Sequence, residues 1–179
     1  MIAARQTYLG TSKGNAEEEM WKELFIGLTE NTLPETFVVP ADVTKIGREF
    51  WLMSSMCKDI TFLADMTSFK NNSTAYGSPN LKIIRMPNQT SITYPGPTMN
   101  GGAEELHIPN VKSFGARTYV FGTSASRLDI YIDNSTCAQI MAFPNFPGAT
   151  PGQESKLFFH GSDGIISYDG SAWVITPNS

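Results

Sequence analysis

One short pattern recurs five times along the chain. Two apolar residues are separated by one other residue and followed at once by proline or by the residue in its place, as in FVVP, ITFL, IRMP, LHIP and IYID. The final positions of these copies are separated by 23, 24, 22 and 24 residues, and they are Pro40, Leu63, Pro87, Pro109 and Asp133. A nearly constant period of this length is typical of proteins built from stacked repeats.

Each copy predicts a strand that ends at a corner. Alternating apolar residues indicate a short strand with one buried face, and proline ends the strand because it has no N–H for a ladder. A unit of 22 to 24 residues cannot bury its apolar face alone, but stacked units can. We therefore predict a β-rich solenoid with a short parallel sheet along one side and a mostly irregular other side. Its expected core includes Ile60, Phe62, Ile84, Met86, Leu106, Ile108, Ile130 and Ile132.

Length and charge limit the function classes. The 179 residues suffice for one domain with a core, and a net charge of −4 without a basic run gives no support for a nucleic-acid partner. No stretch approaches the length of a membrane span, so membrane insertion is not expected. The start of the chain lacks the apolar segment of a signal peptide, which predicts that the general secretory route is not used.

The repeat segments resemble a known family. FVVPADVTKIGREF with Cys57 after it, LKIIRMPNQTSI and EELHIPNVKSFG are similar to the BspA-type leucine-rich repeat, over about Leu33 to Ile140. The resemblance implies a non-enzymatic binding or structural module, typically on a bacteriophage particle as a tail, fibre or capsid-associated protein. The partners it implies are other virion proteins or a host surface receptor or glycan, with a homo-oligomer possible. The alternative is a bacterial cell-surface adhesin.

The N-terminal segment, residues 1–35, is expected to be a tail followed by a short helix. Three glutamates precede an apolar stripe in NAEEEMWKELFIGLTEN, which favours a helix with one apolar face. That helix either caps the first repeat or docks on a partner, and the sequence leaves both open. The residues that would do so are Met20, Trp21, Leu24, Phe25 and Leu28.

The remaining chain divides into a repeat domain of about five units, residues 36–143, and a C-terminal segment, residues 144–179. A linker-like loop, FPNFPGATPGQES at residues 143–155, lies where the two meet. The turn dipeptides Asp163–Gly164 and Asp169–Gly170 then divide two or three strands. We expect these strands to form an antiparallel β cap that seals the last repeat.

Catalytic residues are not apparent in the sequence. The two histidines and two cysteines have no metal-site or catalytic spacing, so no enzyme, cofactor or metal is predicted. Cys57 closes a repeat and is expected to be a small core residue, since unactivated cysteines usually are.

The surface of the predicted sheet is the candidate binding site. Between the inward residues, each strand carries one outward residue, giving a column of Val38, Thr61, Arg85, His107 and Tyr131. The column two residues earlier reads Thr36, Asp59, Ile83, Glu105 and Asp129. We expect a partner to bind Arg85, His107 and Tyr131, flanked by Ile83, Glu105 and Asp129, with Tyr131 offering a flat ring. A merely solvated surface is the alternative.

Overall fold

The computed structural model describes residues 35–39, 41, 45–46, 57–66, 68–69, 80–92, 102–115 and 121–179, with the backbone alone at 45–46 and 68–69. The predicted N-terminal helix lies outside these residues. So do all five of its candidate docking residues, Met20, Trp21, Leu24, Phe25 and Leu28.

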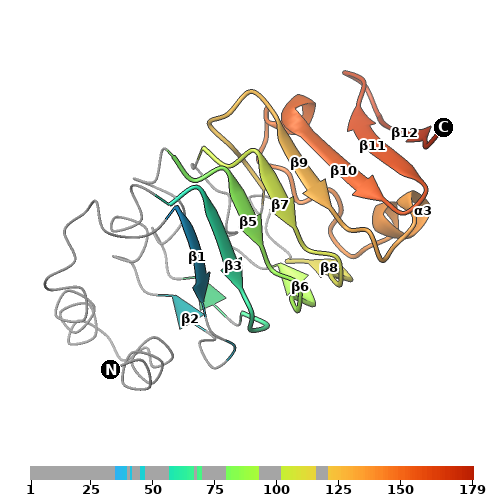
Figure 1. Cartoon of the computed structure of the whole chain (residues 1–179). Coiled ribbons are helices and arrows are strands. Elements are labelled where there is room, and N and C mark those ends of the chain that lie inside the picture. Colours follow the sequence, from blue (N-terminus) through green and yellow to red (C-terminus); the bar gives the residue numbers. More distant parts are fainter. Residues whose placement is uncertain are drawn as a thin grey trace, which may run out of the picture.

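An eight-stranded sheet dominates the described part of the chain (Figure 1). Its order is β1 (Thr36–Val39), β3 (Asp59–Phe62), β5 (Ile83–Arg85), β7 (Glu105–His107), β9 (Leu128–Tyr131), β10 (Leu157–Gly161), β11 (Gly164–Tyr168) and β12 (Trp173–Pro177). The first six strands run parallel, and β11 is antiparallel to both of its neighbours, β10 and β12. A β-rich fold with a mostly parallel sheet is therefore confirmed.

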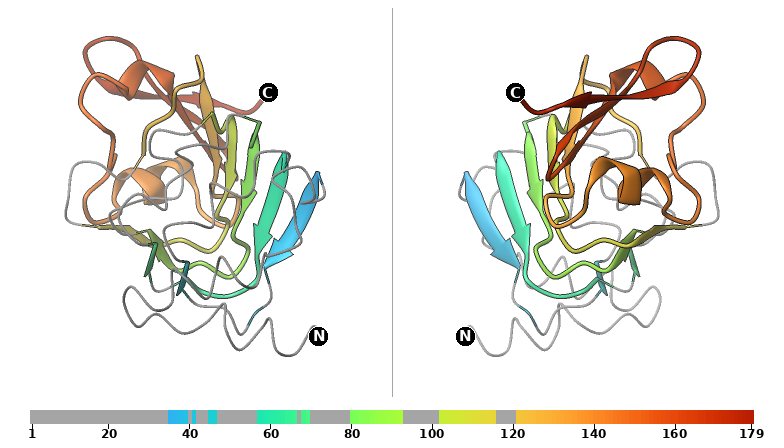
Figure 2. Two further views of the ribbon diagram at one scale, coloured as in Figure 1. Left: turned by 90° about the vertical axis from the view of Figure 1, so that its left-hand side faces the viewer. Right: turned by 90° about the vertical axis from the view of Figure 1, so that its right-hand side faces the viewer.

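Two smaller parallel sheets follow the main strands in the sequence. One pairs β2 (Lys45–Ile46) with β4 (Ser68–Phe69), and the other pairs β6 (Ser91–Ile92) with β8 (Ser113–Phe114). Seen from either end of the molecule, they lie below the large sheet (Figure 2). Helical structure in the described part is limited to α3 (Cys137–Met141) and the 3₁₀ turn η2 (Glu154–Lys156).

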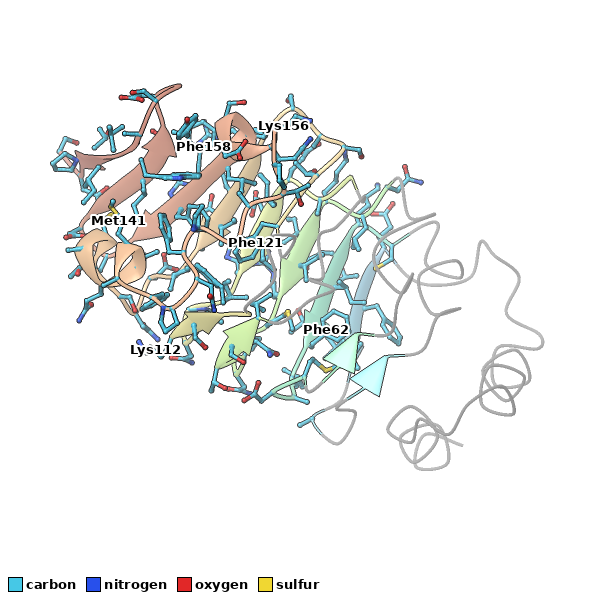
Figure 3. All side chains as sticks on the ribbon, turned by 180° about the vertical axis from the view of Figure 1, so that it is seen from behind. Phe62, Lys112, Phe121, Met141, Lys156 and Phe158 are labelled. Carbon is cyan, nitrogen blue, oxygen red and sulfur yellow. The ribbon has the colours of Figure 1, made fainter. Side chains whose placement is uncertain are left out.

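The predicted core is confirmed. All eight residues expected inside, from Ile60 to Ile132, are fully buried, and so is Cys57. They belong to one hydrophobic cluster that extends along the stacked strands, with Phe62 and Phe121 at different points in it (Figure 3). The cluster forms because the strands pair in register, which places each apolar residue beside its counterpart on the next strand.

Asparagine side chains join successive turns at the corners after β5, β7 and β9. Asn88 donates to the carbonyl of Leu63 at 2.7 Å, and Asn110 donates to the carbonyl of Pro87 at the same distance. Asn134 continues the series by donating to the Asn110 side chain. Beside this row, Gln89 is 2% exposed and its amide bonds to the backbone of the preceding turn. The Gln89 bonds satisfy backbone groups that are buried at the corner, whereas the asparagine bonds lie at the surface.

The C-terminal strands pair antiparallel, as predicted, and the structure adds two features. Both turn dipeptides lie at hairpin turns, between β10 and β11 and between β11 and β12. The first added feature is that β10 also pairs in parallel with β9, so the cap is continuous with the parallel sheet. The second is that the predicted linker-like loop contributes to the core, because the Phe146 ring packs 5.2 Å from Phe159 and 5.4 Å from Trp173.

Candidate binding face

The strand register places the predicted surface residues side by side. Arg85 is the partner of His107, and His107 is the partner of Tyr131, so the outward column forms as expected. The structure extends this column by one residue, because β10 places His160 opposite Tyr131. The neighbouring column aligns Asp59, Ile83, Glu105 and Asp129, and adds Phe158.

Three rings stack along the outward column, and we call His107, Tyr131 and His160 the ring row. The ring centroids of His107 and Tyr131 are 4.4 Å apart with an interplanar angle of 10°. Those of Tyr131 and His160 are also 4.4 Å apart, at 22°. Parallel strands lie about 4.8 Å apart, so identical positions on adjacent strands bring flat side chains into stacking distance. Both faces of the Tyr131 ring are therefore covered by imidazoles.

This stacking corrects one expectation about Tyr131. Its ring does not offer a flat apolar face to a partner, because its two neighbours occupy both faces. What the ring row can present is a line of ring edges and polar atoms. Burial, together with the nearby carboxylates of Asp129 and Glu105, raises the pKa of the Tyr131 hydroxyl, so it stays a hydrogen-bond donor at neutral pH.

Carboxylates from the neighbouring column fix the orientation of these side chains. Glu105 Oε2 lies 2.9 Å from His107 Nε2, and Asp129 Oδ1 lies 2.6 Å from His160 Nε2. Arg85 donates from Nε and Nη2 to the Asp59 carboxylate at 3.1 to 3.2 Å. Each polar side chain of the outward column from β5 to β10, apart from Tyr131, is thus held by an acid from the other column.

Arg127, which precedes β9, completes the network. It donates to both oxygens of Asp129, at 2.7 and 2.6 Å, and its guanidinium lies 3.8 Å from the centre of the Phe158 ring. Burial of the Asp129 carboxyl opposes its ionisation, but hydrogen bonds from Arg127 and His160 outweigh this effect and lower its pKa. Asp129 is therefore a charged centre that joins β9 to β10.

Sequence reasoning missed three members of this network: Arg127, Phe158 and His160. The spacing explains the omission, since Tyr131 and His160 are 29 positions apart whereas the earlier pairs are separated by 22 to 24. The alternation in LFFHG, with Phe158 and His160 on one face, is a signal that could have identified them.

Potential metal ligands, thiols and helices also occur among the residues that the structure describes. No three His, Cys, Asp or Glu side chains converge there as metal ligands would. Burial raises the pKa of Cys57, and raises that of Cys137 to about 11, so both thiols stay protonated near neutral pH. Within the same described ranges, every helix is too short or too polar to cross a bilayer.

The chain was compared with protein-family models, curated proteins and solved structures. The chain matches no family model, no curated protein and no solved structure.

Proposed function

We propose that the chain is a non-enzymatic binding module, a leucine-rich-repeat solenoid of the BspA type that binds a partner through its sheet face. The observation that carries this proposal is the ring row, stacked across β7, β9 and β10 and fixed by carboxylates. The solenoid assignment draws support from the regular parallel pairing and from the asparagine bonds between successive turns.

Preorganisation favours recognition by this face. A side chain that is already stacked and hydrogen-bonded loses little rotamer freedom when a partner arrives, and such ordering otherwise costs about 0.5–1.5 kcal/mol for each side chain. Arg85 and His107 are held by carboxylates, and the Tyr131 ring is held between two imidazoles. A partner would meet these groups already in their bound positions.

The chemistry of the face favours a neutral polar partner, and we propose a saccharide. Arg85 and Arg127 pair with Asp59 and Asp129, and Glu105 lies beside them, so charges of both signs are interspersed on this face. Because the Tyr131 faces are covered, recognition would use hydrogen bonds at ring edges and polar atoms rather than stacking of a sugar on a ring. Three adjacent strands span about 10 Å, enough for one or two sugar units.

Binding of purified chain to a glycan array tests this proposal. For the glycans that bind, titration calorimetry would compare the wild type with Tyr131→Phe, which removes the hydroxyl but keeps the ring, and with Arg85→Ala. We expect each variant to weaken binding about tenfold, the equivalent of one lost hydrogen bond. Val38→Ala, at the far end of the same column, is the control and should change nothing. Unchanged affinity in both test variants, or an array without bound glycans, would contradict the proposal.

We also propose that the module serves on a bacteriophage particle, as a tail, fibre or capsid-associated protein, with a bacterial cell-surface adhesin as the alternative. This placement rests on the resemblance of the repeats alone. The virion and adhesin placements can be distinguished by mass spectrometry. The samples are purified phage particles and bacterial cell-surface fractions. Detection in particles would support the virion, and detection only at the cell surface would favour the adhesin.

A further inference from the structure

The outer edge of β12 has the features of a surface that pairs with a second copy of the chain. β12 is the last strand of the large sheet and lies at its outer end (Figure 1). Within the described residues, β11 is its only strand partner. Natural edge strands are often protected from such pairing by charged side chains or by proline; no charged side chain follows Asp169 in this sequence, and β12 has one proline, Pro177.

The hydrogen-bond pattern identifies which backbone groups of β12 face outward. In the β11–β12 hairpin, the backbone N–H of Asn178 donates to the Asp163 carbonyl, and that of Asp169 donates to the Ala172 carbonyl. These two residue pairs are therefore of the hydrogen-bonded type. Hydrogen-bonded and non-hydrogen-bonded pairs alternate along an antiparallel ladder. The backbone groups of Val174 and Thr176 therefore face β11, while those of Trp173, Ile175 and Pro177 face away from it.

The position of Pro177 agrees with this alternation of inward-facing and outward-facing backbone groups. Its missing N–H would have pointed outward, so the proline removes no bond from the β11–β12 ladder. The groups left at the outer edge are the N–H and C=O of Trp173 and of Ile175, and the C=O of Pro177. A strand that pairs here must accept from two N–H groups and must not depend on a donor at Pro177.

We propose that β12 pairs antiparallel with β12 of a second copy, about a two-fold axis at Ile175. The two Ile175 residues then exchange both N–H···O=C bonds, and each Trp173 N–H donates to the Pro177 carbonyl of the other copy. This register uses Pro177 only as an acceptor. The proposal does not depend on the proposed function of the sheet face.

The side chains of β12 complement themselves in this register. Ile175, which is 43% exposed, meets the second copy's Ile175, and Trp173 meets Pro177 on the same face. On the opposite face Val174, 37% exposed, lies against Thr176. Apolar and β-branched cross-strand pairs are the stabilising ones in sheets. Because paired residues share a face, the ring rows of both copies would lie on the same side of the joined sheet.

A charge-swap experiment on the full chain tests this arrangement by sedimentation velocity, from low to high micromolar concentration. The interface is small, below about 1,200 Å², so the wild type should dimerise reversibly with rising concentration. Ile175→Lys and Ile175→Glu should each be monomeric, because like charges meet at the axis. An equimolar mixture of the two should recover the dimer. Met141→Lys, which alters a side chain of similar exposure on α3, should dimerise like the wild type.

Each alternative outcome would overturn the proposal. A monomeric wild type at the highest concentration would exclude self-pairing, and protection of the Trp173 and Ile175 amides from hydrogen exchange in that monomer would assign the edge to another segment of the same chain. Dimers that persist in both variants would place the interface elsewhere. Monomeric variants whose mixture stays monomeric would exclude a two-fold axis at Ile175.

Discussion

Gln89 offers the sharpest test of how the corners of this fold are held. Its side chain is 2% exposed and makes three hydrogen bonds to backbone. Oε1 accepts from the Met66 N–H at 2.8 Å, and Nε2 donates to the Met66 carbonyl at 3.0 Å and to the Ser91 carbonyl at 2.6 Å. One amide thus joins the turn after β3 to the turn after β5.

Replacing Gln89 with leucine keeps a similar volume but removes all three bonds. A buried backbone group left without its partner costs about 1–3 kcal/mol, so three such groups cost roughly 3–9 kcal/mol. Burial of the more apolar leucine offsets about 1–3 kcal/mol of this loss. The middle values of these two ranges leave a fall of about 4 kcal/mol in the free energy of unfolding, a large share of the 5–15 kcal/mol typical of a domain.

Urea unfolding followed by circular dichroism measures this change, and Asn88→Leu is the matched control. Asn88 is the adjacent residue, but it is exposed and its side chain donates to the Leu63 carbonyl at the surface, so its loss should cost less than about 1 kcal/mol. Hydrogen exchange at the Met66 amide should also accelerate in the Gln89 variant. The reasoning would be refuted if both variants lost the same small free energy of unfolding and if hydrogen exchange at the Met66 amide stayed unchanged.

Three further predictions concern the core, the hairpin and acid stability. Ile108→Ala should lower the free energy of unfolding by about 2–5 kcal/mol, measured in urea, because Ile108 is fully buried, whereas exposed Val38→Ala should cost little. Gly164→Ala should lower the melting temperature, since the added Cβ would lie 2.6 Å from the Thr176 carbonyl oxygen, and an unchanged melting curve would count against this contact. Asp129 stabilises the fold above its unfolded pKa of about 4, because its folded pKa is lower, and this contribution is lost as the pH falls through the folded value. Asp129→Asn should therefore flatten the decline of stability on acidification, and an equally steep decline in both proteins would contradict the assignment.

The repeat pattern was sufficient to predict the sheet and its two outward columns. Strand register follows from alternation, because a shift of one residue would turn every apolar side chain out of the core. With Ile84, Leu106 and Ile130 inside, Arg85, His107 and Tyr131 had to lie together outside. The stacking geometry could not be predicted, since it depends on side-chain rotamers that the pattern does not specify.

The features that sequence reasoning missed lack this periodicity. Gln89 follows a proline and an asparagine, where a polar residue is ordinarily exposed, so nothing in the sequence marks it as buried. Helix α3 is only five residues long, yet its capping box, Thr136 with Gln139 three positions later, is a recognisable local signal. The insertion that contains α3 lengthens the last spacing, which is why His160 was not assigned to the outward column.

The hairpin at the end of the sheet has a consequence for the order in which the chain can fold. The β10–β11–β12 pairings close over short turns, whereas each parallel pairing joins strands that are 22 to 29 positions apart. Closing a longer loop costs more entropy, so the hairpin should form first and then act as a template for β9, β7 and the earlier strands in turn. During synthesis that template leaves the ribosome after all the strands that it organises. The parallel strands would therefore emerge before the template that they need, and the sheet should form only after translation has passed β12.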